Sequence, residues 1–242
     1  MLILEDHLLL TLDDVTGKAV VDASYREQVA AGALLVELAL LGRVDLAGDG
    51  NGGRVGRIVV RDTSPTGSVL LDDALVVVRS REGSTPKALI GPIAKTKPAD
   101  AALEALAARG ILRREHGRVL GIFPTTRWPA ADSRHEDAVR ADLWRVLVDG
   151  AAPAERTGAL VALLAATNQA GRVLAAGGMR GAPAGTGGGR SWTLAERRAV
   201  DRRAEELARS SWAGEAVRAY VEEVTAVILA GATVATAAAA TS

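Results

Sequence analysis

One stretch of the sequence, residues 24–42, reads SYREQVAAGALLVELALLG. Its apolar residues recur at the spacing of one helix face, and they include Val29, Ala33, Val36 and Leu40. Gly42 follows the last of them and can end a helix. We therefore expect a core helix from Ser24 to Leu41. Glu37 lies inside this apolar run, and we expect it on a solvated face of the helix.

Around this helix, the composition indicates one globular domain with an aliphatic core. The chain has 242 residues, of which 48% are hydrophobic and 3% aromatic, so it can bury a core of ordinary size. Its 29 Lys and Arg balance 29 Asp and Glu, which leaves no global positive field to hold nucleic acid. It has no cysteine, which excludes disulfides and thiolate chemistry. The abundance of Ala, Gly, Val, Leu and Arg favours a bacterial cytosolic protein.

Helical periodicity covers most of the remaining chain. Residues 7–16 read as a short helix or strand that enters a turn. Ser68 is expected to cap a helix that runs to about Arg79. Further helices are expected over residues 99–108, 133–149 and 154–176, after the capping box Thr193–Glu196, and over 212–230.

A small β-hairpin is expected within residues 109–123. This segment reads as a helix end, a strand, a polar turn and a second strand, which places the tip near His116 and Gly117. Residues 58–60 indicate another short strand. The fold class is therefore mainly α, a single domain with a β-hairpin.

Two segments have a biased composition. Residues 177–190 are rich in Gly and Ala, and they lack the Gly-Lys-Ser/Thr ending of a phosphate-binding loop. We expect a flexible connector there. The tail from Val224 to Ser242 is uncharged and about as long as a bilayer span. Beyond Leu229 it is mostly Ala, Thr and Gly, so we expect a buried last helix with a frayed end.

No group of residues points to catalysis. The sequence has no Gly-x-Ser-x-Gly elbow, and His7, His116 and His135 have no companion at metal-ligand spacing. Each histidine is expected at the surface or at a helix cap. The acidic pairs at 13–14 and 72–73 lie at a turn and a helix start, where backbone capping explains them. We therefore expect no enzymatic activity, no metal and no cofactor.

Two features remain that suggest binding. The hairpin and the residues after it carry large apolar side chains, namely Val119, Leu120, Ile122, Phe123 and Trp128. They can pack on the core or enter a membrane interface. A scatter of cations precedes the hairpin, namely Arg79, Arg81, Lys87, Lys95 and Lys97. Solvated charges are their ordinary role, but beside an apolar projection they would also detect anionic lipid.

Several ordered segments resemble the Golgi phosphoprotein 3 family. They are LEDHLLL (4–10), LVELALLGR (35–43), PTGSVLLDDAL (65–75), RGIL (109–112) and ALVALLA (159–165). The resemblance covers nearly the whole chain. It implies a mostly α-helical domain around a central helical bundle, a hydrophobic hairpin that dips into the bilayer, and a pocket for phosphatidylinositol 4-phosphate. Eukaryotic members are Golgi peripheral proteins that also bind glycosyltransferase tails.

The first half of the implied lipid pocket differs in this sequence. The family's pocket tryptophan falls at Asp22, with Tyr25 and Arg26 as the nearest aromatic and cationic residues. The family's arginine in the same helix falls at Ala31. The resemblance thus makes Tyr25 and Arg26 candidates for the lipid head group.

The second half of that pocket differs too. The family's paired arginines fall near Thr96 and Ala99, which leaves Lys95 and Lys97 as neighbouring substitutes. Lysine neutralises a phosphate but lacks the bidentate fork of arginine. The resemblance therefore supports the fold more strongly than it supports the same head-group specificity.

Together these features predict a non-enzymatic cytoplasmic protein that docks peripherally on the inner face of a membrane and binds anionic phospholipid. An alternative is a winged-helix-like scaffold, because a helix, RGIL and a hairpin also end a winged-helix unit. Its wing would contact DNA or another protein, and the zero net charge disfavours nucleic acid. Protein clients and a homo-oligomer are left open.

Overall fold

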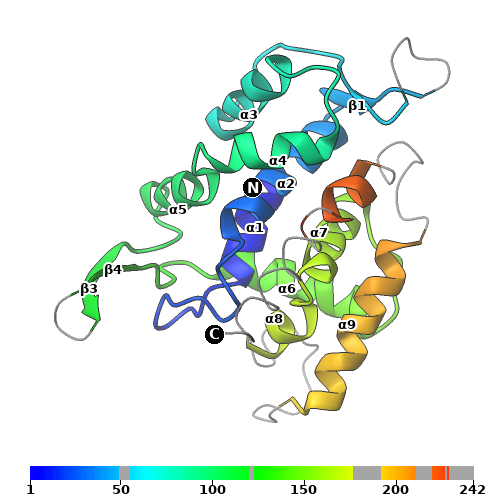
Figure 1. Ribbon diagram of the computed structural model, residues 1–242. Helices are drawn as coiled ribbons and strands as arrows, with labels where there is room; N and C mark the ends of the chain where they lie inside the picture. The colour runs from blue at the N-terminus through cyan, green and yellow to red at the C-terminus, as the bar shows by residue number, and fades with distance from the viewer. Residues whose placement is uncertain (49–54, 120–122, 177–191, 211–219, 227, 229–242) are drawn as a thin grey trace, which may run out of the picture.

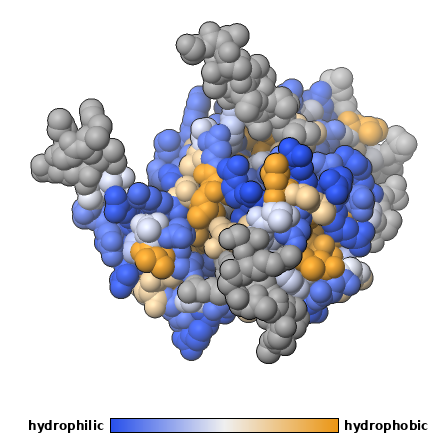
Figure 2. Space-filling view, turned by 90° about the horizontal axis from the view of Figure 1, so that it is seen from below, coloured by the Kyte–Doolittle hydropathy of each residue, from blue (hydrophilic) through white to orange (hydrophobic). Residues whose placement is uncertain are grey.

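The computed structural model describes residues 1–48, 55–119, 123–176, 192–210, 220–226 and 228, and it shows helices gathered around a central helix (Figure 1). This helix, α2, spans Arg26–Leu40, close to the stretch predicted. Every residue from Val29 to Ala39 is buried, as expected for a helix that is apolar on all sides. On the face seen from below, hydrophobic residues form small separate patches between hydrophilic ones (Figure 2).

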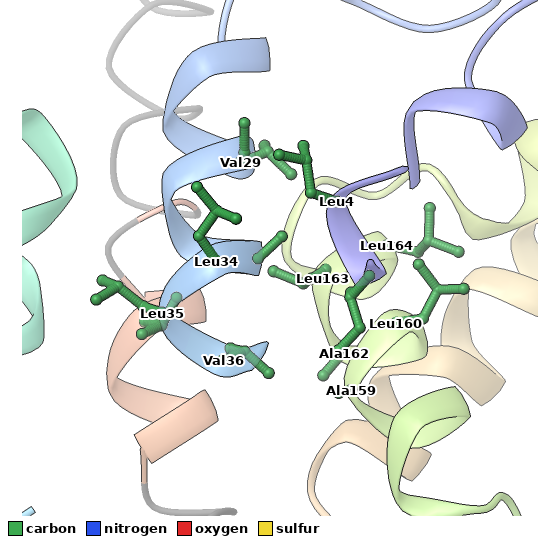
Figure 3. Close-up of a cluster of buried hydrophobic side chains, with 14 of the residues drawn as sticks. Leu4, Val29, Leu34, Leu35, Val36, Ala159, Leu160, Ala162, Leu163 and Leu164 are labelled. Carbon is green, nitrogen blue, oxygen red and sulfur yellow. The ribbon is translucent and has the colours of Figure 1, made fainter. Parts of the chain in front are cut away.

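Among the labelled helices α1 to α9, five contact α2 directly. They are α1 (Ile3–Leu10), α3 (Val69–Arg79), α4 (Pro86–Ala94), α5 (Pro98–Ala108) and α7 (Glu155–Ala166). Figure 3 shows Leu4 of α1 pointing toward Val29 of α2, with Leu163 of α7 close by. The mainly α-helical fold with a β-hairpin is therefore confirmed.

Glu37 is buried in this core, so its expected place on a solvated face is wrong. Its side chain is only 7% exposed. Its Oε2 accepts a hydrogen bond from the backbone N–H of Ile3 at 2.6 Å, and its Oε1 accepts one from Arg156 at 2.5 Å. Because both oxygens are satisfied, the carboxylate joins the starts of α1 and α7 to the last turn of α2.

The helix expected over residues 154–176 is in fact two helices. α7 ends at Ala166 and α8 (Ala170–Ala176) begins after a bend of 105°. At the corner Asn168 has a left-handed backbone with φ +53°, a conformation that asparagine tolerates better than most residues. The apolar periodicity continues across the corner, which is why the sequence pattern alone does not reveal the break.

Two further helices cover the other side of α7. α6 spans Arg134–Leu147, and α9 spans Leu194–Ala208 and opens with the predicted capping box. α8 packs closely on α9 at Gly171, where an added Cβ would lie 2.3 Å from the backbone oxygen of Arg197. A side chain at this position would therefore push the two helices apart.

The helix start at Ser68 is placed correctly, but its capping differs from the prediction. Ser68 is the N-cap residue of α3, and its side chain makes no capping hydrogen bond. The Asp72 carboxylate instead accepts hydrogen bonds from the backbone N–H and the hydroxyl of Thr66, both at 2.8 Å. The turn before the helix is thus fixed by Asp72 of the acidic pair 72–73, as expected for a capping role.

Two small antiparallel pairs of strands complete the fold. β1 (Val44–Leu46) pairs with β2 (Ile58–Val60), and β3 (Glu115–Val119) pairs with β4 (Phe123–Arg127). The expected tip at His116 and Gly117 is wrong, because these residues pair with Thr126 and Thr125 in the middle of the ladder. The β-branched threonines extend the strand pairing past the polar run. Residues 120–122, between the strands, lie outside the described residues.

The described part of the last helix packs on α2. An added Cβ on Gly32 would lie 2.9 Å from the side chains of Val224 and Ile228, and both are buried. The connector expected at 177–190 and most of the tail lie outside the described residues. Within the described ranges, no single helix is long and apolar enough to cross a bilayer; α7 and α8 pass such a test only when joined across their bend.

Candidate functional site

A cavity of about 390 Å³ lies beside the start of α2. We call it the α2 cavity. Its walls come from the last turn of α1, the loop before α2, the first turns of α2, one residue of α5, and the corner between α7 and α8. Apolar side chains such as Leu8, Val29 and Leu103 form much of the wall. Polar side chains interrupt it, namely His7, Thr11, Asp22, Tyr25, Arg26, Thr167, Asn168 and Gln169. A mostly apolar hollow with a few polar groups is the usual form of a small-molecule site.

Asp22 holds a negative charge at the wall of the α2 cavity. Its Oδ1 accepts hydrogen bonds from the backbone N–H of Ser24 at 2.9 Å and from the Ser24 hydroxyl at 2.6 Å. These bonds lower the pKa of Asp22 below its ordinary value, and nearby Arg172 lowers it slightly further. The carboxylate is therefore ionised at neutral pH.

His7 is a site residue that sequence reasoning missed. We expected it at the surface or at a cap, but it is 5% exposed and lines the α2 cavity. Burial lowers the pKa of His7 to about 4, so the imidazole is neutral at pH 7. The reason is that α1 is buried along its entire length, which takes its polar residues inside with its leucines.

The other two histidines lie elsewhere. His135 Nε2 lies 2.7 Å from Asp6 Oδ1, and its side chain is 40% exposed. His116 is exposed on β3. The surface role expected for His116 thus agrees with its position. Within the described residues, no group of three or more His, Asp or Glu could hold a metal ion.

Four residues of the wall of the α2 cavity carry buried polar atoms for which no hydrogen bond is found, namely His7 Nε2, Tyr25 Oη, Arg26 Nε and Gln169 Oε1. These atoms are covered by neighbouring atoms and do not face the cavity. The Gln169 side chain also acts as a partner of the His7 ring and opposes the lowering of its pKa by burial. Gln169 follows the unpredicted corner between α7 and α8, and therefore no sequence signal identified it.

The first turns of α2 and α5 contact each other beside this cavity. Arg26 forms an ion pair with Asp100 of α5, and Glu27 Oε2 accepts a hydrogen bond from the backbone N–H of Ala99 at 3.0 Å. Lys95 and Lys97, which immediately precede α5, are exposed. We call Arg26, Lys95 and Lys97 the cationic rim. Of the predicted head-group residues, Tyr25 and Arg26 line the cavity, and Lys95 and Lys97 lie just before the helix that Arg26 contacts.

Two residues at or near the α2 cavity have an unfavourable backbone conformation. Among the described residues, Lys97 with φ +59° and Asn168 with φ +53° are the two non-glycine residues with positive φ. Asn168 lines the α2 cavity and Lys97 belongs to the cationic rim. Such conformations are unfavourable for residues with a Cβ and are often found at functional sites.

The remaining predicted cations do not join this site. Arg79 ends α3, Arg81 lies in the turn that follows, and Lys87 lies in the first turn of α4. All three are exposed, and none lines the α2 cavity. Lys87 and Lys95 are near opposite ends of α4, about 12 Å apart along its axis at 1.5 Å per residue.

The five predicted hairpin residues lie in different surroundings. Val119 and Phe123 form the last pair of the described ladder, while Leu120 and Ile122 lie outside the described residues. Trp128 is 8% exposed and belongs to the hydrophobic core, with the Arg114 guanidinium 5.8 Å from its ring centroid. Its predicted place on a membrane-inserting surface is therefore wrong. The cause is that its backbone N–H donates to the Gly17 oxygen at 3.1 Å, which holds the hairpin base on the body.

Comparison with known proteins identifies one family. The model of the family described as Golgi phosphoprotein 3 matches residues 3–224, which is nearly the whole chain. No curated protein matches the chain significantly.

Proposed function

Because the chain belongs to the Golgi phosphoprotein 3 family, a family of non-enzymatic lipid-binding adaptors, we propose that it docks peripherally on anionic membranes. In this proposal the head group of an anionic phospholipid enters the α2 cavity, and the hairpin end inserts into the bilayer. The protein acts at the cytoplasmic, inner face of the membrane. Phosphatidylinositol 4-phosphate is the head group that the family resemblance suggests first.

The observation that carries the proposal is the cationic rim beside the α2 cavity. Arg26 lines the cavity, and Lys95 and Lys97 are exposed just before α5, whose first turn pairs with Arg26 through Asp100. A lipid phosphate at this edge would meet positive charge, and each Lys or Arg near an anionic surface contributes on the order of 1 kcal/mol. The polar side chains that line the cavity, such as Thr167 and Asn168, would contact the rest of the head group.

The hairpin supplies the second contact. β3 and β4 project from the body on the side of α5 (Figure 1), and the sequence at their end is Val-Leu-Gly-Ile-Phe, residues 119–123. Burying such side chains in a bilayer contributes about 25 cal/mol per Å² of apolar surface. We therefore propose the apolar sequence between β3 and β4 as the part that contacts the membrane.

Cosedimentation at physiological salt tests the proposal. The full chain is mixed with vesicles of phosphatidylcholine alone, with vesicles that also contain phosphatidylinositol 4-phosphate or phosphatidylglycerol, and separately with duplex DNA. We expect binding to the anionic vesicles and none to neutral vesicles or DNA. Binding to DNA without binding to vesicles would favour the winged-helix-like alternative instead.

A further inference from the structure

We propose that the side chains of Asp14 and Glu136 share one proton, and that the loss of this proton loosens the base of the β3–β4 hairpin. Asp14 lies in the turn after α1, and Glu136 lies in the first turn of α6. We call residues 11–19, which contain this turn, the base loop. The inference goes beyond the proposed function, because it concerns a pH-dependent contact inside the protein and requires no lipid.

Backbone hydrogen bonds join the base loop to the hairpin. The Gly17 oxygen accepts one from the N–H of Trp128 at 3.1 Å, and the Asp14 oxygen accepts one from the N–H of Ala130 at 2.9 Å. An added Cβ on Gly17 would lie 2.3 Å from the backbone nitrogens of Trp128 and Pro129. Figure 1 shows the chain after α1 turning beside the start of the hairpin. A displacement of the base loop would therefore break hydrogen bonds of the hairpin base.

Glu136 connects the base loop to α6. Its side chain is 3% exposed, and its Oε1 accepts hydrogen bonds from Arg140 Nε at 2.9 Å and from Arg140 Nη2 at 2.6 Å. It also makes a side-chain hydrogen bond with the carboxyl group of Asp14, which is half-buried. Two ionised carboxylates cannot bond to each other, because neither has a donor. The contact therefore requires a proton on one of the two groups.

The surroundings of Glu136 keep this proton bound up to near-neutral pH. Burial raises the pKa of Glu136 to about 7, Arg140 opposes this rise, and the neighbouring charge of Asp14 adds to it. When the proton leaves, two negative charges are in contact in a region with little water. Asp14 is the more exposed of the two and lies on a loop, so we expect the base loop to move away rather than α6.

The helices packed against α6 are α1, α7, α8 and α9. Charged groups on these helices have other partners, namely Glu5 with Arg109, Asp6 with His135 and Arg156, Arg172 with Asp22, and Asp201 with the Gly171 N–H. Among the described residues, the charged groups that act on Glu136 are Arg140 and Asp14.

The pH range of the effect follows from the two states of the base loop. With the loop closed, the pKa of Glu136 is about 7, and with the loop open it returns toward the ordinary 4.5. The closed form thus binds the proton more tightly, so its stabilisation is complete below pH 4.5 and is lost as the pH rises to 7. Opening should become more favourable by up to about tenfold per pH unit in this range.

Amide hydrogen exchange of the full chain without lipid tests the proposal from pH 5 to 7.5. The observed exchange of the Trp128 and Ala130 amides is divided by the intrinsic rate at each pH. We expect their protection to fall by up to about tenfold per pH unit until pH 7. Glu136→Gln keeps a donor toward Asp14 at every pH, and Asp14→Asn supplies a donor to ionised Glu136. Both variants should therefore lose the pH dependence.

The control is Glu115→Gln, which removes an exposed carboxylate from β3 that lies 3.8 Å from Arg113. It should keep the pH dependence of the parent. If the protection of Trp128 and Ala130 in the parent does not change with pH, or if Glu136→Gln changes with pH as the parent does, the proposal is wrong.

Carbon-13 NMR of the parent gives a second measurement that needs no variant. The carboxyl carbons of Asp14 and Glu136 should titrate in two separate steps, because they share a proton. A single step near pH 4.5 for Glu136 would contradict the proposal even if the variants did not fold. Because neither measurement uses vesicles, this result leaves membrane docking to its own test.

Discussion

At the scale of single residues, buried polar groups connect the N-terminal helix to the rest of the protein. Glu37 receives hydrogen bonds from Ile3 and Arg156, and Arg156 also donates to the Met1 oxygen at 2.5 Å. His7 lies at the other end of α1 with a neutral ring. Each group has a measurable effect on the free energy of unfolding: Glu37 through the hydrogen bonds that it accepts, and His7 through its dependence on pH.

Replacing Glu37 with leucine should destabilise the protein by about 2–4 kcal/mol, because the Ile3 N–H and the Arg156 guanidinium lose their buried acceptor. Chemical denaturation measures the change. Asp142→Ala serves as the control, since Asp142 forms an exposed ion pair with Arg145 and its loss should cost less than about 1 kcal/mol. Equal effects of the two substitutions would contradict the role of Glu37.

His7 should make stability depend on pH. Its pKa is lowered in the folded state to about 4 from 6.5, so the unfolded chain binds a proton more readily between these values. The stabilisation is complete above pH 6.5 and is lost as the pH falls toward 4, by about 3 kcal/mol in total. The free energy of unfolding of the parent and of His7→Leu is measured across this range.

The comparison with His7→Leu removes other titrating groups. Burial raises the pKa of Glu136 to about 7, so its contribution falls as the pH rises through the same region, opposite in sign to that of His7. Both proteins contain Glu136, and the difference between their stability curves isolates His7. Parallel curves from pH 4 to 6.5 would show that the imidazole titrates normally in the folded protein.

At the scale of elements, close contact between helices decides where small residues are required. α8 meets α9 at Gly171, and the backbone oxygen of Arg197 occupies the space that a Cβ would need. Gly91 in α4 is also helical but has nothing within 4 Å of its added Cβ. These two glycines therefore differ in environment and share a secondary structure.

Gly171→Ala should destabilise the protein by about 1–3 kcal/mol, because backbone atoms cannot move aside for the added methyl group. Gly91→Ala should change its stability by less than about 1 kcal/mol, since the backbone entropy that alanine saves in a helix is opposed by the contact of its Cβ with the following Pro92. Thermal unfolding of both variants measures the difference. A stable Gly171→Ala protein would mean that α8 and α9 are less closely packed than described.

Much of this architecture could be predicted from local sequence. The core helix, the boundaries of α3 and α5, the capping box of α9 and the presence of a hairpin all depend on residues close together in the chain. The bend at Asn168 could not be predicted, because apolar periodicity is the same on both sides of it. The register of β3 and β4 depended on the pairing of Thr125 and Thr126 rather than on the polar run that suggested a turn.

The candidate site was only partly predictable. Tyr25, Arg26, Lys95 and Lys97 were found through the family resemblance, and the ion pair between Arg26 and Asp100 brings their two segments together. His7 and Gln169 were not found, since their roles depend on which elements fold against α2 rather than on any local motif.

At the scale of the whole molecule, two separate surfaces should contribute differently to membrane binding. Leu120→Ser with Phe123→Ser should weaken vesicle association at every salt concentration, because apolar burial is not screened by ions. Lys95→Ala with Lys97→Ala should weaken it mainly at low salt, where exposed charges are least screened. Vesicle cosedimentation across a salt series measures both.

Thermal unfolding accompanies these measurements, because a hairpin end that packs on the body would lose stability instead of membrane affinity. If both double variants stay folded and bind anionic vesicles as the parent does, membrane docking through the hairpin and the cationic rim is excluded.

The α2 cavity is closed by segments far apart in the chain. Gln169 lies 147 positions after Asp22, to whose carbonyl oxygen its amide donates at 3.5 Å, and both line the cavity with His7. During synthesis, the nascent chain therefore has no complete cavity until the corner after α7 has left the ribosome. A protein shortened before that corner would lack the site even if α1 and α2 formed, so ligand occupancy would report that the chain has folded as far as Gln169.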